Sequence, residues 1–366
     1  MTVYLITLLI SILFSRMAED RHESDSSIGE KYILYEEKNT GIYFFLAGCV
    51  LVFVSGLRYK VGTDYWTYYN GYTGYINRLF HSIVSLDEPG YGILAWIATR
   101  FVNDGAAVIF VSALVTISLP LIVIYRNTKS LSVALALFVL RGFWHGSFNG
   151  VRQYLAASVL FCGYNYLKEK QLLKYFLVVC IAFLFHRSAI VMLFLYPVVY
   201  RKINQVNILL SAAVLAVFSF YSRPMFSVAG WIMDKQYSLN NGYTSHQVNI
   251  IRVVAACIPA IIFLVLYWGE ELSDSETFYL NLLIVHAAIR LFTMNSALLY
   301  RVGIYTTAFA VIAIAELLEG LHDSNRKIVT AGILAMYFGM WWYELAGTSS
   351  LNHFQWIWQR REVDRK

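Results

Sequence analysis

The chain has 366 residues, of which 58% are hydrophobic and 14% are charged, and its formal net charge is +6. Soluble domains carry about 25% charged residues. The composition therefore excludes an ordinary soluble domain, a disordered chain, a disulfide scaffold and a nucleic-acid-binding protein.

Apolar segments of about 18 to 22 residues recur along nearly the whole sequence, and each can cross roughly 30 Å of hydrocarbon as a helix. We therefore predict an all-α, polytopic integral membrane bundle of about 10–12 transmembrane helices that forms a single domain over residues 1–366. The predicted spans lie near residues 2–15, 40–57, 105–125, 130–147, 150–167, 171–186, 187–200, 204–222, 249–268, 277–296, 302–320 and 327–345.

Four stretches do not have the pattern of a span. Residues 16–39 read as a charged connector, residues 58–104 as an outer-face aromatic and Gly-rich segment with an amphipathic helix, and residues 222–248 as an outer loop. Residues 351–366 form an amphipathic basic tail, which we predict to be a helix at the membrane interface. The polar triplet at residues 186–188 predicts two short helices instead of one long span over 171–200.

The type of basic residue differs between the two membrane sides. With twelve spans and the N-terminus outside, the inner connectors hold eight Lys and five Arg, and the outer side, leaving out the C-terminal tail, holds ten Arg and two Lys. A charge inside an apolar span is costly unless it faces an interior cavity. We therefore expect an outward-facing site that is lined by arginines and binds an anion. The arginines within spans or at their edges are Arg141, Arg152, Arg187, Arg252, Arg290 and Arg301.

The stretch GLRYKVGTDYWTYY, residues 56–69, combines a charged turn with aromatic side chains. Rings beside fixed polar groups form the floor and rim of carbohydrate sites, although an aromatic belt at the membrane surface explains the rings alone. The candidate sugar-binding residues are Tyr59, Tyr65, Trp66, Tyr68, Tyr91 and Gln153.

Four motifs resemble the EpsG-like branch of the Wzy-type bacterial polysaccharide polymerases. They are GLRYKVGTDYWTYY, EPGYGIL, VRQYLAASVLFCGYNYL and FHRSAIVMLFLYPV, and the resemblance continues more loosely through YRVGIY at residues 300–305. It implies a GT-C-like, inverting glycosyltransferase in the bacterial cytoplasmic membrane, with its active site facing the exterior. Donor and acceptor would both be oligosaccharides on undecaprenyl pyrophosphate, and a chain-length regulator of the polysaccharide co-polymerase type would be a partner.

This chemistry requires fixed positive charge for the leaving pyrophosphate and a base for the attacking hydroxyl. The candidate pyrophosphate ligands are Arg58, Arg152, Arg187, Arg290 and Arg301, and the candidate bases are His186, Asp64 and Glu88. We expect no metal and no cofactor, because arginines supply the charge and no motif of a cofactor site occurs.

Structural roles remain open for each candidate base. Asp64 can cap the following helix or hold Arg58 in a salt bridge, Glu88 can cap the helix that follows it, and His186 can be a core residue bonded to a carbonyl group. Three other activities also fit in part: an O-antigen ligase, a flippase or transporter of an anionic lipid, and a membrane acyltransferase. An assay with a single lipid-linked repeat unit as donor and acceptor separates the polymerase from the ligase.

Overall fold

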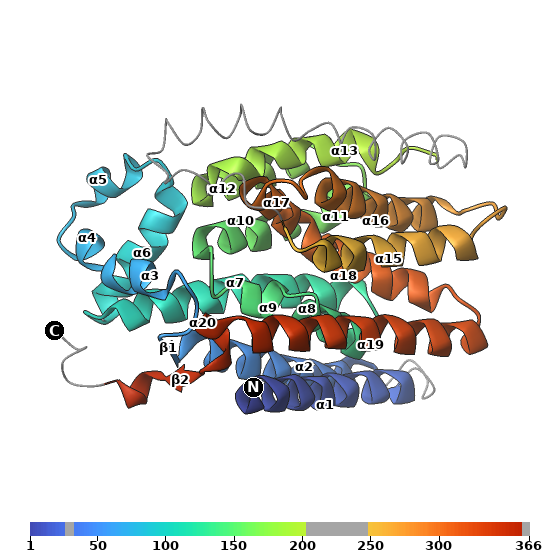
Figure 1. Ribbon diagram of the computed structural model, residues 1–366, viewed down its shortest axis with the longest axis horizontal. Coiled ribbons are helices and arrows are strands. Elements are labelled where there is room, and N and C mark those ends of the chain that lie inside the picture. The colour runs from blue at the N-terminus through green and yellow to red at the C-terminus, as the bar shows by residue number, and fades with distance from the viewer. Residues whose placement is uncertain (26–32, 203–247, 361–366) are drawn as a thin grey trace. The chain divides into compact units, whose positions relative to one another are not determined.

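The computed structural model describes residues 1–25, 33–202 and 248–360, and the chain is an all-α polytopic membrane protein (Figure 1). The predicted span 204–222, residues 222–247 of the predicted loop 222–248, and residues 361–366 of the tail lie outside the described residues. The chain divides into two compact units, Met1–Ile190 with Tyr337–Lys366, and Val191–Met336. That the chain forms a single domain stays a prediction.

The first unit is built mainly of packed helices. Helix α1 packs against α2 and α8, and α7 packs against α2, α6 and α10, while α12 covers α6 and α10. The bounds are α1 Thr2–Asp25, α2 Ile33–Gly56, α7 Gly105–Asn127, α8 Leu131–Leu140, α9 Phe143–Gly146, α10 Val151–Phe161, α11 Tyr164–Lys168 and α12 Leu172–Phe185.

Between α2 and α7 the chain forms short elements at one end of this unit (Figure 1). They are strand β1 Arg58–Tyr59 and helices α3 Tyr65–Asn70, α4 Thr73–Ile76, α5 Phe80–Val84 and α6 Pro89–Phe101. Helix α6 buries residues such as Leu94 and Ala98 and exposes others such as Ile97 and Arg100, so the amphipathic helix expected in this segment is present. A proline at the first position suits the start of this helix, because its missing N–H has no partner there anyway.

The second unit packs α16 against α15 and α18. Its elements are α13 Leu195–Val198, α15 Ile250–Leu266, α16 Asp274–Phe292, α17 Ala297–Tyr300, the 3₁₀ turn η2 Arg301–Gly303 and α18 Ile304–Glu319. Helix α19, Asp323–Gly347, begins in this unit and ends in the first one.

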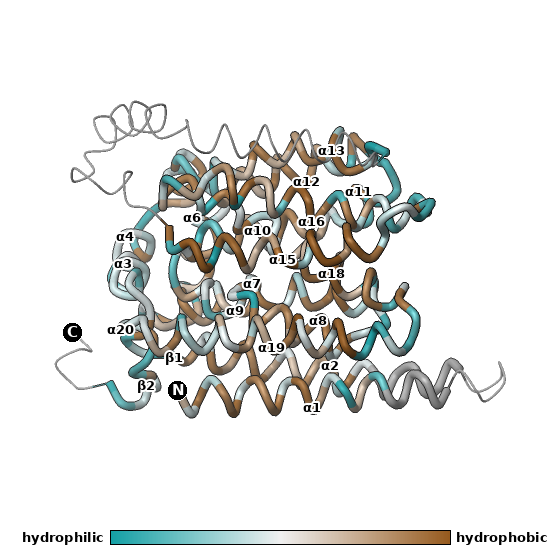
Figure 2. The backbone as a smooth tube through the Cα atoms, turned by 45° about the vertical axis from the view of Figure 1, so that its right-hand side comes forward, coloured by the Kyte–Doolittle hydropathy of each residue, from teal (hydrophilic) through white to brown (hydrophobic). Residues whose placement is uncertain are grey.

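Four described helices are long and apolar enough to cross a membrane: Thr2–Glu19, Gly105–Asn127, Ala297–Glu319 and Asp323–Gly347. Five shorter apolar helices accompany them: Gly41–Gly56, Leu131–Leu140, Leu172–Phe185, Arg187–Val198 and Ile250–Leu266. Figure 2 shows mostly brown, hydrophobic colour along the long helices and teal residues chiefly near their ends. Large apolar side chains such as Leu9 and Leu13 on α1 face outward, as expected for contact with lipid. The full count of about 10–12 spans stays a prediction.

The break in the segment 171–200 is confirmed, because α12 ends before His186, whose backbone is extended with φ −158° and ψ 121°. The second half differs from a regular span, since it forms the 3₁₀ helix η1, Arg187–Phe194, and only then a short α-helix. The prediction of a connector over residues 16–39 was wrong at its two ends, because α1 continues to Asp25 and α2 begins at Ile33.

The prediction of an amphipathic helix in the tail was wrong for the described residues. After the short helix α20, Ser349–Asn352, the chain forms strand β2, Gln355–Trp356, and the turn η3, Ile357–Gln359. Strand β2 pairs antiparallel with β1, with Arg58 opposite Trp356. Backbone hydrogen bonds to another part of the chain satisfy the N–H and C=O groups that a helix would have satisfied internally.

Candidate active site

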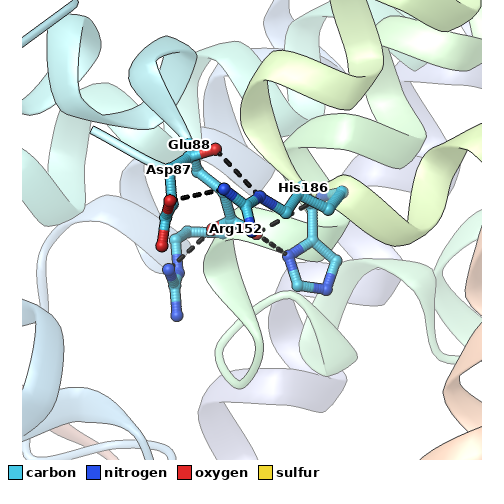
Figure 3. A network of polar contacts seen from close by, with 5 residues as sticks. Asp87, Glu88, Arg152 and His186 are labelled. Atoms are coloured by element: carbon cyan, nitrogen blue, oxygen red, sulfur yellow. Dashed lines mark hydrogen bonds and ion pairs between the residues drawn. The ribbon is translucent and has the colours of Figure 1, made fainter. Parts of the chain in front are cut away.

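Glu88 is the centre of a group of polar side chains at one end of the first unit (Figure 3). It precedes α6, but its side chain does not cap that helix. Instead, Oε2 accepts a hydrogen bond from Nη1 of Arg152 at 2.6 Å, and Oε1 lies 2.6 Å from Nδ1 of His186. The carboxylate therefore connects the first turn of α10 with the end of α12.

The lowered pKa of Glu88 determines which of the two side chains donates in this contact. Burial would raise its pKa, but the hydrogen bond from His186 and the charge of Arg152 outweigh burial and hold the pKa below its ordinary value. Glu88 is therefore ionised at neutral pH and can only accept hydrogen bonds. Nδ1 of His186 must carry the proton of the bond between them, which leaves Nε2 available for another partner.

Arg152 places its guanidinium against Glu88, and Arg187 places its own against the neighbouring Asp87. The side chain of Arg152 is 47% exposed and that of Arg187 is 54% exposed. Arg187 donates its backbone N–H to Oε1 of Glu88 at 3.3 Å, and its guanidinium binds the carboxylate of Asp87. Both cations thus keep accessible N–H groups that can bind an anion.

Asp64 lies next to this group but makes different contacts. Its side chain does not cap α3. Oδ2 of Asp64 accepts the backbone N–H of Gly150 at 2.8 Å, and Gly150 is the N-cap residue directly before α10. Asp64 is therefore connected to Arg152 through the backbone at the start of that helix.

Arg58 makes its described contacts away from Glu88. It is 3% exposed, donates to the carbonyl groups of Ser55 and Val61, and stacks over the ring of Phe148 at 4.7 Å. Burial lowers its pKa to about 10, so it is charged at neutral pH. The arrangement fits a residue that closes the turn after α2, and a pyrophosphate would reach it only after this packing opened.

The expected sugar-binding residues divide by exposure. Trp66 is 39% exposed and Tyr68 is half-buried, so each presents part of a ring. Buried side chains, at 6% exposure or less, are Tyr59, Tyr65, Tyr91 and Gln153. Tyr59 and Tyr65 belong to one core cluster and Tyr91 to another, so these three rings pack the segment instead of presenting a face.

Arg290 and Arg301, two of the expected pyrophosphate ligands, lie in the second unit. Arg290 donates to the carbonyl of Tyr300 at 3.1 Å and to the hydroxyl of Thr307 at 3.2 Å, and it stacks over the ring of Tyr300. A Cβ at Gly303 would lie 2.6 Å from the guanidinium carbon, so only glycine leaves room for this arrangement. Arg301 is half-buried in the turn η2.

Two further groups were not singled out as site residues from the sequence. Asn149, in the loop before α10, binds the turn that contains Asp64. The sequence clue to its role was its place between the aromatic motif and VRQYL.

His145 and Glu344 form a second pair, with Nε2 and Oε2 3.5 Å apart. Gly142, with φ +86°, separates α8 from α9, the short helix that carries His145.

Among residues 1–25, 33–202 and 248–360, no group of three or more His, Cys, Asp or Glu side chains is arranged to hold a metal ion. Metal independence of the reaction stays a prediction.

The model of the EpsG family matches residues 41–357, nearly the whole chain. The chain belongs to the EpsG family. It is thereby a membrane protein of polysaccharide biosynthesis. The matched range contains every side chain of the group around Glu88. Searches of curated proteins and of solved structures find no match.

Proposed function

We propose that this EpsG-family protein is a polysaccharide polymerase that joins oligosaccharide repeat units carried on undecaprenyl pyrophosphate. The observation that carries the proposal is the binding of Arg152 and His186 to one carboxylate, that of Glu88. A cation for a leaving anion and a base for an incoming hydroxyl are the two groups that this transfer needs.

In the proposed reaction His186 is the general base. Glu88 holds Nδ1–H, so Nε2 is the ring nitrogen that would accept the proton of the attacking sugar hydroxyl. A carboxylate behind an imidazole also stabilises the imidazolium that forms when the proton arrives. Glu88 is then a positioning residue, and His186 touches the reacting atoms.

Arg152 and Arg187 bind the pyrophosphate of the donor. The hydroxyl oxygen forms a bond to the anomeric carbon, the bond from that carbon to the pyrophosphate oxygen breaks, and its electron pair leaves with the pyrophosphate. The proton of the hydroxyl goes to Nε2 of His186. A planar guanidinium suits the departing anion because its paired N–H groups match two phosphate oxygens.

The site would face the outer side of the bacterial cytoplasmic membrane, in a GT-C-like bundle. Support comes from the Arg-rich connectors on the side assigned as outer and from the position of Arg152 and His186 at helix ends. Trp66 and Tyr68 would contact sugars of the repeat unit, and a chain-length regulator would be a partner in the membrane.

The test is reconstitution of the purified protein in liposomes with one lipid-linked repeat unit as donor and acceptor. A ladder of products that lengthens by whole repeat units, and survives chelation of divalent ions, supports the proposal. Transfer only when lipid A core is added would instead indicate a ligase. Movement of the lipid across the bilayer without a new glycosidic bond would indicate a flippase.

A further inference from the structure

Two turns that are far apart in the sequence exchange side-chain hydrogen bonds. Oδ2 of Asp64, in the first turn, accepts the N–H of Gly150 in the second. Oδ1 of Asn149, in the second turn, accepts the backbone N–H of Thr63 at 2.6 Å and its hydroxyl at 2.9 Å. Each turn thus supplies the acceptor for backbone groups of the other.

The two backbones also touch directly. Gly62 has φ +100°, and a Cβ there would lie 2.7 Å from the carbonyl oxygen of Phe148. The N–H of Gly62 donates to the carbonyl of Ser350 at 3.0 Å, so the C-terminal segment holds the same turn from another direction. The turn that carries Asp64 is therefore held by two other segments of the chain, residues 148–150 and Ser350.

The hydrogen bond between Asp64 and Gly150 lies at the start of α10. Gly150, at φ +62°, precedes the first residue of the helix, and Arg152 follows in its first turn. The guanidinium of Arg152 binds Glu88 at 2.6 Å, and a displacement of the first turn would move it. A change of about 1 Å in a catalytic group can reduce a rate on the order of a hundredfold.

We infer that Asp64 is a positioning residue, which fixes the start of α10 and thereby the guanidinium of Arg152, and that it is not the proton acceptor. The inference rests on the proposed function and selects among the candidate bases of that site. Asp64 uses one oxygen for Gly150, and its other oxygen lies 3.4 Å from the hydroxyl of Thr63.

An asparagine at position 64 separates this role from that of a base. Its carbonyl oxygen can accept the N–H of Gly150, and its amide can donate to the hydroxyl of Thr63, which already donates to Asn149. The amide cannot accept a proton from a substrate hydroxyl. Asp64→Asn therefore keeps the positioning contact and removes basicity, whereas Asp64→Ala removes both.

The experiment compares the wild-type protein, Asp64→Asn and Asp64→Ala in liposomes, at matched amounts of folded protein. Asp274→Ala, which removes an exposed carboxylate in the second unit, is the control. We expect Asp64→Asn to keep its rate within about threefold with an unchanged pH profile, and Asp64→Ala to fall by at least about tenfold. If Asp64→Asn, folded normally, is as inactive as Asp64→Ala, the inference is wrong.

Hydrogen exchange of peptides covering residues 146–152 gives a second readout that needs no substrate. Asp64→Ala should exchange faster in this segment, and Asp64→Asn should match the wild type. Equal exchange in all three proteins would overturn the inference even if activity changed. If the wild-type protein makes no polymer, the proposed function fails, while the exchange data still decide whether Asp64 fixes the start of α10. If Asp64→Ala does not accumulate, the comparison of Asp64→Asn with the wild type decides alone.

Discussion

Nδ1 of His186 lies 2.6 Å from Oε1 of Glu88, although 98 positions separate the two residues. The carboxylate comes from the residue before α6 and the imidazole from the residue after α12. Each side chain is thus held at a helix end where the backbone leaves regular structure. The packing of α12 against α6 keeps the pair together.

Replacement of Glu88 should remove most of the activity. In Glu88→Gln the amide N–H₂ faces either Arg152, which puts two donors together, or Nδ1 of His186, which must then accept and moves the imidazole proton to Nε2, where it blocks proton uptake. We expect a loss of at least about a hundredfold for both Glu88→Gln and Glu88→Ala, measured as polymer formed per folded molecule. Glu271→Gln, at an exposed position, is the matched control and should keep wild-type activity. Full activity in Glu88→Gln would contradict the role of the carboxylate.

The stability of the protein should fall in acid because of Glu88. Its pKa in the folded state lies below the ordinary value of 4.5, so its stabilising contribution is complete above about pH 4.5 and is lost as the pH falls through the lowered pKa. Thermal unfolding in detergent, followed from pH 7 downward, should show a steeper acid loss in the wild type than in Glu88→Gln. Parallel curves for the two proteins would exclude this contribution.

Arg58→Lys should reduce stability more than the activity of each folded molecule. Lysine keeps the charge, but its ammonium cannot stack on Phe148 as a guanidinium does while donating to the carbonyls of Ser55 and Val61. We expect a loss of about 1.5–3 kcal/mol of unfolding free energy, with a larger loss in Arg58→Ala. The measurement is the thermal midpoint together with the polymer formed per folded molecule. A stable Arg58→Lys protein without activity would instead support contact with pyrophosphate.

Removal of Arg360 should loosen the C-terminal segment. Nη1 of Arg360 lies 2.6 Å from Oδ2 of Asp104, which caps α7, and also binds the hydroxyl of Tyr69. This pair is 15% and 24% exposed, so Arg360→Ala should lower the unfolding free energy by about 1–3 kcal/mol. It should also speed proteolysis of the tail.

The matched control for Arg360 is Arg326→Ala. The pair of Arg326 with Glu319 is 40% and 35% exposed, so its loss should change stability by less than about 1 kcal/mol. Equal effects of the two variants would show that the tail contributes no more than a surface ion pair.

Sequence patterns within a few residues predicted where helices begin and end, because neighbouring residues determine helix ends. The polar residues at 186–188 predicted the end of α12, because a charged group within an apolar run favours an interruption. The expectation of a helix directly after Glu88 likewise agrees with the start of α6 at Pro89. The tail was misjudged because strand β2 forms only by pairing with β1, nearly 300 positions away. A two-residue strand has no pattern of its own that hydropathy can detect.

The amino-acid sequence alone was enough to recognise a helical membrane protein of the EpsG family and to name Glu88, Arg152 and His186 as candidate site residues. These properties follow from hydropathy and from residue types within short windows. Three relationships became visible only in the folded chain: these three side chains meet, Asp64 binds Gly150, and Arg58 is buried away from them. The reason is physical: such contacts depend on how helices pack, and packing is set by many weak contacts between residues far apart in the chain.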